Sequence, residues 1–504
     1  MQRYTNDVLD ISEALNTPVY LDINEKTGGS KMKKLISLLL ALVMVAGLVA
    51  CGSKEAAPEA TDGAKPEAAT EAATEAATEA APEAGKITGT LEVAAFSNGD
   101  LNDQYWEAAK EEFNKLYPDC EVTLILSANI EESMRPRFIN DNPPDVYFMG
   151  GQANADIAPL TAEGKLMDLT DWYNTVEAIG YDGLLKDNMA TEMLNRYNGG
   201  IYGMGTTYGV WACLYNKNML EEHGWTLPSN WQEFEALAAE IKSTTDIYPI
   251  IHQGMYPDYM GYGLMQGGIA TDGGKELLVK MGNLDATAFD DPAVVSAYKK
   301  YEEVRANDWA PEYCLSMSHT EAQLMWLQGK ALFLPCGNWL AGEMADSLPE
   351  GFEIGLFPSF WHDSAETPVM VGNGAYTVIP ADCKNPEAAK AFLQVLFSKT
   401  MIRKAAELGR GIPVMKDDLD GMKLDAESQQ ALDLANAGEV NVIFEIGGAG
   451  NFEPYGEMRT AIKNGIASIL SGEKDSATAL EDIKAEVDRI REDDSIAKVT
   501  ISVS

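Results

Sequence analysis

Aromatic residues beside Gly, Asn or Asp recur in the predicted loops of this 504-residue chain. Such a set offers a flat apolar ring next to hydrogen-bonding groups, which suits a sugar, because sugars have C–H-rich faces and a rim of hydroxyls. The sets are Phe96-Ser97-Asn98, Tyr208-Gly209-Val210-Trp211, Gly337-Asn338-Trp339, Trp361-His362-Asp363, Asn373-Gly374-Ala375-Tyr376 and Glu453-Pro454-Tyr455. They predict non-covalent carbohydrate binding, although any single ring could instead pack under its loop.

Trp339 is the strongest of these candidates because it directly follows a predicted strand, Ala331 to Leu334. In α/β sheets the ligand crevice lies beyond the carboxyl ends of the strands. Other tryptophans fall on predicted helices or beside apolar runs and are interpreted as packing residues. These are Trp106, Trp172, Trp231 and Trp326.

The sequence lacks the usual signatures of catalysis and metal binding. The four histidines are far apart, and the glycines from Gly203 to Gly209 miss the dinucleotide-binding pattern by one residue. The cysteines after Cys51 are odd in number and show no CxxC spacing, which favours buried thiols over disulfides or zinc. We therefore expect no enzyme activity, cofactor or metal, while a glycosidase whose two carboxylates are distant in sequence stays open.

Charge and the N-terminal region restrict the partners and the location. A net charge of -40 argues against nucleic acid as a partner. Basic Met32-Lys33-Lys34, the apolar run Leu35 to Gly47 and Leu48-Val49-Ala50-Cys51 resemble the signal peptide and lipobox of bacterial lipoproteins. That resemblance implies lipidation of Cys51 and a membrane anchor.

The first 86 residues thus divide into three predicted parts. Residues 1–31 are an upstream extension ahead of a biological start at Met32, and residues 32–50 are the signal peptide. Residues 51–86 begin with the lipidated Cys51 and continue as a stalk of Ala, Glu, Thr and Pro, which cannot bury a core. We expect the stalk to space a folded body from the membrane.

The folded body opens with a predicted β-α-β-α-β series. Its parts are a strand at Leu91–Phe96, a helix from Asn102, a strand at Glu121–Leu126, a helix at Ile130–Ile139 and a strand at Asp145–Met149. A parallel sheet follows from this alternation. The loops after the first and third strands should then meet at the ligand crevice, which nominates Asn98, Asp100 and Gln152 as binding residues.

A second α/β region starts near Gly203. Its best helix has Ser229 with Gln232 three residues on, which predicts a capping box, and Asn385-Pro386 predicts another helix start. Two more apolar stripes at helical spacing predict C-terminal helices. Their core residues are Met458, Ile462, Ile466 and Ile469, then Leu480, Ile483, Val487 and Ile490.

In order along the chain, several motifs resemble the extracellular solute-binding proteins of carbohydrate ABC importers, the family that includes maltose-binding protein. They are Pro144-Asp145-Val146-Tyr147-Phe148, Leu166-Met167-Asp168-Leu169-Thr170, Gly200-Ile201-Tyr202-Gly203-Met204, Leu214-Tyr215-Asn216-Lys217, Trp231-Gln232-Glu233-Phe234 and Gln328-Gly329-Lys330-Ala331. The resemblance covers nearly all of residues 88–504.

This resemblance implies an α/β, two-lobed periplasmic-binding-protein-like fold of class II, with hinge-connected lobes that each have a central sheet flanked by helices. Lobe 1 would comprise residues 87–207 and 372–411, and lobe 2 residues 208–371 and 412–504. Crossings between the lobes would fall near residues 206–211, 358–372 and 411–416.

The implied function is capture of a sugar or oligosaccharide and its delivery to a permease, by a lipid-anchored, extracellular, monomeric protein. By resemblance, Asn98 and Asp100 match a polar first loop, Trp339 matches a stacking aromatic, and Tyr455 falls near another. The remaining predicted ligand-binding residues are Gln152, Tyr208, Trp211, Asn338, Trp361 and Asn373. A glycan-acting enzyme, a receptor for a polyamine or peptide, and a sensor remain alternatives.

Overall fold

The computed structural model describes residues 87–97, 100–150, 156–416, 424–443 and 454–501. The predictions for the extension, the signal peptide, Cys51 and the stalk lie outside the described residues, as do those for Asn98 and Gln152. Asp100 begins a helix, but its side chain is not described. In the described part of the chain, no helix is long and apolar enough to span a membrane.

Six strands form the first sheet, in the order β2-β1-β3-β11-β5-β4. Parallel pairing of β1 with β2 and with β3 confirms the predicted β-α-β-α-β series. β11 runs antiparallel to β3 and β5, and β4 antiparallel to β5. The strands are β1 (Gly89–Phe96), β2 (Cys120–Ser127), β3 (Val146–Met149), β4 (Leu194–Tyr197), β5 (Gly200–Met204) and β11 (Tyr376–Val378).

The helices associated with this sheet present regular apolar faces to the core. In α2, Tyr105, Ala109 and Phe113 recur four residues apart and are buried. Asn385 caps α14 by accepting a hydrogen bond from Ala388 N at 3.3 Å, which confirms the predicted helix start. The helices are α2 (Asp100–Leu116), α3 (Ile130–Ile139), α4 (Ile157–Ala162), α5 (Thr170–Thr175), α14 (Pro386–Leu396) and α15 (Lys399–Glu407).

The second sheet has the order β13-β10-β6-β8-β7, and β9 and β12 also pair with β6. All seven residues of β8 are buried, as expected for a strand covered on both faces. The strands are β6 (Thr207–Asn216), β7 (Tyr248–Ile250), β8 (Ala331–Gly337), β9 (Ile354–Phe357), β10 (Val369–Asn373), β12 (Ile412–Pro413) and β13 (Asn441–Ile443).

A larger set of helices accompanies the second sheet. The eight apolar residues predicted to form the core of the two C-terminal helices are all buried in α17 and α18. The helices are α6 (Lys217–His223), α7 (Trp231–Thr244), α8 (Asp258–Met260), the π-helix η4 (Gly261–Met265), α9 (Gln266–Gly273), α10 (Lys275–Gly282), α11 (Pro292–Ala306), α12 (His319–Leu327), α13 (Leu340–Glu343), α16 (Ala426–Asn436), α17 (Gly456–Ser471) and α18 (Ser476–Glu492).

The predicted capping box at Ser229 is wrong in its detail. Helix α7 starts at Trp231, and Asn230 is its cap, accepting a hydrogen bond from Glu233 N at 3.0 Å. The Glu233 carboxylate in turn accepts bonds from Ser229 N and Oγ, both at 2.8 Å, and these bonds lower its pKa. A charged carboxylate is the stronger acceptor, which favours Glu233 over the amide of Gln232.

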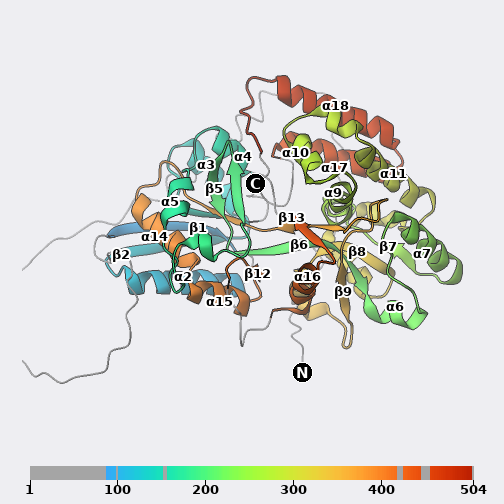
Figure 1. Ribbon diagram of the computed structural model, residues 1–504, viewed down its shortest axis with the longest axis horizontal. Coiled ribbons are helices and arrows are strands. Elements are labelled where there is room, and N and C mark those ends of the chain that lie inside the picture. The colour runs from blue at the N-terminus through green and yellow to red at the C-terminus, as the bar shows by residue number, and fades with distance from the viewer. Residues whose placement is uncertain (1–86, 98–99, 151–155, 417–423, 444–453, 502–504) are drawn as a thin grey trace, which may run out of the picture. The chain divides into compact units, whose positions relative to one another are not determined.

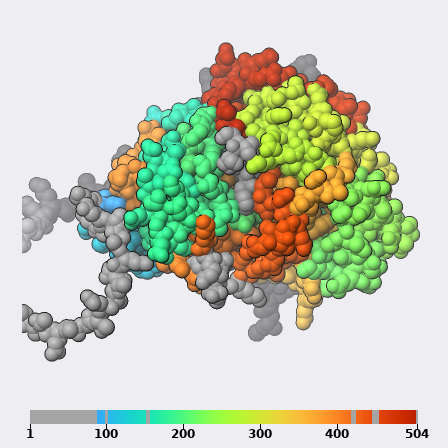
Figure 2. Space-filling model, in the orientation of Figure 1, coloured from blue at the N-terminus to red at the C-terminus, as the bar shows by residue number. Residues whose placement is uncertain are grey.

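The chain passes between the two sheets at several points. It leaves β5 at Met204 and enters β6 at Thr207, and it returns between the end of β10 at Asn373 and Tyr376 of β11. It then reaches β6 again through β12, where Ile412 pairs with Tyr208. Figure 1 shows β6 between the two groups of elements, and these groups cover separate surface regions in Figure 2.

Four of the five described cysteines, Cys120, Cys213, Cys314 and Cys336, are buried free thiols, as predicted, and Cys383 is partly buried. Burial raises the pKa of the Cys383 thiol to about 11 and that of the Cys314 thiol to about 12. Because the thiolate is the reactive form, these two thiols are poor nucleophiles at neutral pH.

His252, after β7, gives the fold a pH-dependent weakness. It is 2% exposed, and burial lowers its pKa to about 4. Because an unfolded histidine titrates near 6.5, the native state favours the neutral ring, and stability is lost as pH falls from about 6.5 towards 4. We expect this group to account for up to about 3 kcal/mol of that loss. In urea unfolding at several pH values, His252→Gln should flatten the profile and the exposed His223→Gln should not; identical profiles for His252→Gln and wild type would contradict this.

Candidate functional site

Strand β6 brings several of the predicted binding residues together. Trp211 lies opposite Gly337 of β8 on one side and opposite Val371 of β10 on the other. Two residues earlier on β6, Gly209 lies opposite Asn373 of β10. Loops far apart in sequence therefore meet at the end of the second sheet where the chain crosses from the first.

Four aromatic rings cluster at this end of the sheet. The Trp211 ring lies 4.7 Å from that of Trp339 at 90°, 5.2 Å from Tyr259 at 88° and 5.1 Å from Tyr262 at 51°, measured between ring centroids. All four side chains are only partly buried. We call Trp211, Tyr259, Tyr262 and Trp339 the aromatic platform.

Two glycines leave room for the Trp339 ring. A Cβ at Gly337 would lie 2.1 Å from the ring's Cζ3, and a Cβ at Gly209 would lie 3.4 Å from its Cε3. The ring therefore lies against bare backbone of β8 and β6. Any side chain at position 337 would force it to move.

Gly337→Ala is accordingly expected to displace the Trp339 ring and to weaken its edge-to-face contact with Trp211. Near-ultraviolet circular dichroism, which reports on the asymmetric surroundings of tryptophan, should change. The matched control is Gly342→Ala in α13, where an added Cβ meets nothing within 4 Å. A spectrum as unaltered as that of the control would contradict the assigned packing.

Asn338 is buried and its amide is used within the protein. Its Oδ1 accepts a hydrogen bond from Val210 N at 2.9 Å, and its Nδ2 donates to Ser428 Oγ at 2.7 Å. Ser428 Oγ in turn donates to Asp425 Oδ2 at 2.7 Å. Asn338 therefore fixes the backbone before Trp339, which makes it a positioning residue here.

Tyr208 and Asn373 flank the platform. Tyr208 is 7% exposed, pairs with Ile412 and has a pKa raised by burial. Asn373 is partly buried at the end of β10. Asn373 is the more accessible of these two predicted polar contacts.

Trp361 and Tyr455, which the sequence predicted as ligand contacts, are both buried in the structure. Trp361 is fully buried and its indole N–H donates to Ala297 O at 2.8 Å. Tyr455 is 6% exposed; its hydroxyl donates to Val499 O at 3.2 Å and accepts from Val499 N at 3.1 Å. Neither ring offers a face to a ligand in this structure, because each is enclosed by core residues or by the returning C-terminal segment.

Arg410, which the sequence did not suggest, lies on the first-sheet side of the crossing. Its guanidinium stands 4.3 Å from the centre of the Tyr105 ring and 5.5 Å from that of Phe148, and it donates to Asn102 Oδ1. Burial lowers its pKa, and among the described residues no carboxylate forms an ion pair with it. The cation–π contacts tie the segment before β12 to the first sheet.

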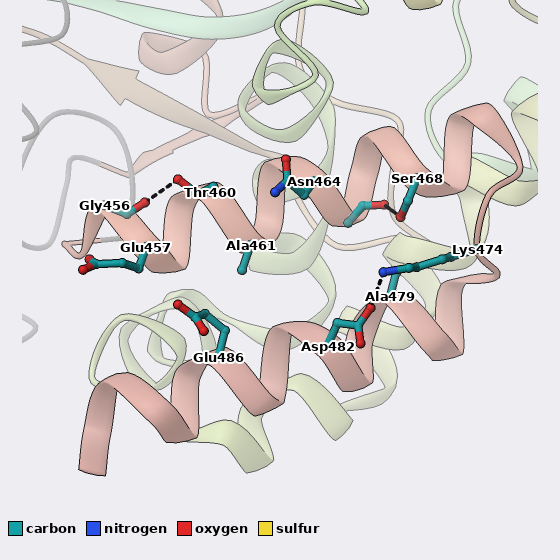
Figure 3. Close-up of a pocket in the computed structure, with 11 residues that line it drawn as sticks. Gly456, Glu457, Thr460, Ala461, Asn464, Ser468, Lys474, Ala479, Asp482 and Glu486 are labelled. Carbon is teal, nitrogen blue, oxygen red and sulfur yellow. Dashed lines mark hydrogen bonds and ion pairs between the residues drawn. The ribbon is translucent and has the colours of Figure 1, made fainter. Parts of the chain in front are cut away.

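A groove of about 710 Å³ lies elsewhere, between α17 and α18 (Figure 3). Its polar groups are largely occupied by neighbours: Lys474 Nζ bonds Asp482 at 2.6 Å, and Thr460 Oγ1 donates to Gly456 O at 2.8 Å. Its lining includes the acidic Glu457 and Glu486 but no aromatic ring. The residues that the structure describes contain no cluster of His, Cys, Asp and Glu fit for a metal ion.

The fold is that of the two-lobed, class II sugar-binding receptors. The structure matches the apo form of RafE from Streptococcus pneumoniae with a TM-score of 0.61 at 20% identity, covering 80% of this chain and 98% of that one. It also matches a chitin oligosaccharide binding protein with a TM-score of 0.61 at 20% identity, covering 79% and 98%.

Sequence comparison agrees with the fold. Residues 98–401 match the bacterial extracellular solute-binding protein family, and the chain belongs to that family. It is 26% identical over 429 residues to the diacetylchitobiose binding protein NgcE of Streptomyces coelicolor, covering 82% of this chain and 87% of that protein. It is 24% identical to the multiple sugar-binding protein of Streptococcus mutans, covering 60% and 70%.

Proposed function

We propose that this protein captures a sugar or oligosaccharide between its two lobes and delivers it to the permease of an ABC importer. The observation that carries the proposal is the aromatic platform, whose four partly exposed rings lie at the end of the second sheet beside the crossing. Stacked rings with hydrogen-bonding groups at their edges suit the faces and hydroxyls of a sugar. Several relatives and structural neighbours are named for sugars that they bind.

We assign residues 87–207 and 372–411 to lobe 1 and residues 208–371 and 412–504 to lobe 2. The distribution of strands between the two sheets supports this assignment, except that Gly372 and Asn373 end β10 and so lie in the second sheet. In a hinged receptor, a ligand that contacts both lobes favours the closed state. The platform would supply the lobe 2 contacts, and the loops after β1 and β3, with Asn98, Asp100 and Gln152, would supply those of lobe 1.

At the end of the second sheet we propose distinct tasks for the predicted residues. Trp211 and Trp339 would stack on the sugar, and Asn373 would bond its hydroxyls. Asn338 and Tyr208 would hold the platform in place, because both are buried. Trp361 and Tyr455 are not retained as ligand contacts.

We also propose that the protein is a monomeric lipoprotein, anchored to the outer face of the cell membrane through acylated Cys51. The lipobox and the stalk of residues 51–86 support this location. Metabolic labelling with an alkyne fatty acid should mark the wild type and not Cys51→Ser. Equal labelling of both would refute the anchor.

A thermal-shift screen of the purified protein tests the proposed ligand class. The panel would contain diacetylchitobiose, maltose, raffinose, xylo-oligosaccharides, a polyamine and a peptide mixture. A true ligand raises the midpoint by mass action, and a saccharide is expected to do so without being cleaved. Chromatography of the same samples detects cleavage; turnover would indicate an enzyme, and a shift only with polyamine or peptide would refute the sugar.

A further inference from the structure

The last described residues form an extended segment that is bound tightly to lobe 2. Asn283 and Ile501 exchange two hydrogen bonds, Ile501 N to Oδ1 at 2.8 Å and Nδ2 to Ile501 O at 2.9 Å. Tyr455 holds Val499 in the same way through its hydroxyl. Val499 and Ile501 are 5% and 2% exposed, so burial of these two apolar side chains also holds the segment in place.

The residue between them, Thr500, bonds to lobe 1. Asn198 N donates to Thr500 O at 3.0 Å, and Thr500 N donates to Asn198 Oδ1 at 2.9 Å. This alternation is the geometry of an extended chain, in which successive backbone groups point to opposite sides. Asn198 has a φ of 51° and lies in the turn between β4 and β5.

This contact is separate from the crossing segments. Other hydrogen bonds that join the two sheets' regions involve the crossings themselves, such as Thr207 Oγ1 to Arg410 O at 2.9 Å and Val414 N to Thr206 O at 3.2 Å. The C-terminal segment is thus a second, independent link.

The order of strands in the first sheet places this link relative to the crossings and to the proposed cleft loops. In the first sheet, the proposed cleft loops follow β1 and β3, the crossings leave from β5 and β11, and the linked hairpin lies at the β4 edge. The crossings therefore lie between the cleft loops and the link. The link therefore joins lobe 2 to the β4 edge of the first sheet, on the other side of the crossing strands from β1 and β3.

We propose that closure of the cleft about the crossings moves the β4 edge away from lobe 2, so that residues 499–501 form a C-terminal strap that stabilises the open orientation of the lobes and lowers the apparent affinity for ligand. The proposal rests on the proposed function, since it concerns the affinity of that cleft. A contact made in only one of two orientations shifts the equilibrium by its own free energy. The loss of one neutral hydrogen bond should change the ratio of closed to open molecules about 3- to 10-fold.

The test uses Asn198→Gly, because glycine accepts a φ of 51° and the change removes the side chain whose Oδ1 accepts from Thr500 N, while the backbone donor to Thr500 O stays. The matched control is Asp141→Gly, another turn residue with positive φ, at 49°. A chain ending at Lys498 removes the whole strap. Distances between spin labels at the exposed Ile139 and Val295 report the lobe orientation without ligand, and calorimetry with diacetylchitobiose reports affinity.

We expect a larger closed fraction in both strap variants and about 3- to 10-fold tighter diacetylchitobiose binding by Asn198→Gly, with the control unchanged. Distances and affinity equal to wild type, or a shift towards the open state, would overturn the strap. A shift to the closed state in a protein that binds no sugar would support the strap and contradict the proposed function.

Discussion

Trp339→Ala is expected to weaken sugar binding by about 30-fold or more while the ligand-free protein keeps nearly the same unfolding temperature. A central aromatic contact in a binding site is typically worth about 2 kcal/mol or more, which corresponds to that loss of affinity. The stability cost is small because the ring is partly exposed and lies against Gly337 and Gly209 at the edge of the core.

Calorimetry and thermal unfolding of the same samples measure both effects. Trp172→Ala is the matched control, since Trp172 is also partly buried but lies in α5, outside the platform. It should leave affinity unchanged. Retained affinity in Trp339→Ala would exclude the platform as the sugar-binding surface.

Trp361→Ala should have the opposite profile, a loss of about 3–5 kcal/mol in the free energy of unfolding. Its ring is fully enclosed, 4.8 Å from the Trp231 ring and 4.9 Å from that of Tyr301. Truncation would leave a cavity and remove the donor that bonds Ala297 O. Urea unfolding measures the loss.

The fraction of Trp361→Ala that remains folded should bind sugar with nearly wild-type affinity. Trp361→Phe serves as the control, because it fills more of the cavity and should restore part of the stability. Wild-type stability combined with lost binding would show that Trp361 contacts the ligand and that its assignment to the core is wrong.

Regular periodicity explains which parts of the fold could be predicted from the sequence. The β-α-β-α-β series and the apolar stripes of α14, α17 and α18 were visible as regular spacings of apolar residues in the sequence. The same residues are buried in the tertiary structure. The cap of α7 was displaced by one residue because Ser229, Asn230 and Glu233 all offer suitable groups. Choosing between them depends on where the helix packs.

The candidate site was harder to predict because it is built by long-range register. Trp339 was located correctly relative to a strand end, and its contact with Trp211 follows from the pairing of β6 with β8. Tyr259 and Tyr262 were missed, although two tyrosines three residues apart in a Gly-rich segment are a recognisable local signal. Arg410 joins Tyr105 from 305 positions later in the chain, and no local pattern indicates that contact.

The burial of Trp361 and Tyr455, two of the predicted ligand-binding aromatics, has the same physical explanation. Trp361 and Tyr455 stand in sequences that resemble exposed loops, but α11 covers the first and Val499 returns to the second. Burial by a distant segment leaves no trace in the neighbouring residues. Separating partly exposed rings from buried rings therefore required the tertiary contacts.

Calorimetric titration of the purified protein with the saccharide that gives the largest thermal shift tests the central claim most directly. We predict saturable binding of one sugar per chain with a dissociation constant of about 1 μM, near 8 kcal/mol, and a negative heat-capacity change from burial of apolar surface. The absence of saturable heat with every saccharide in the panel, or heat that continues as the sugar is consumed, would contradict it.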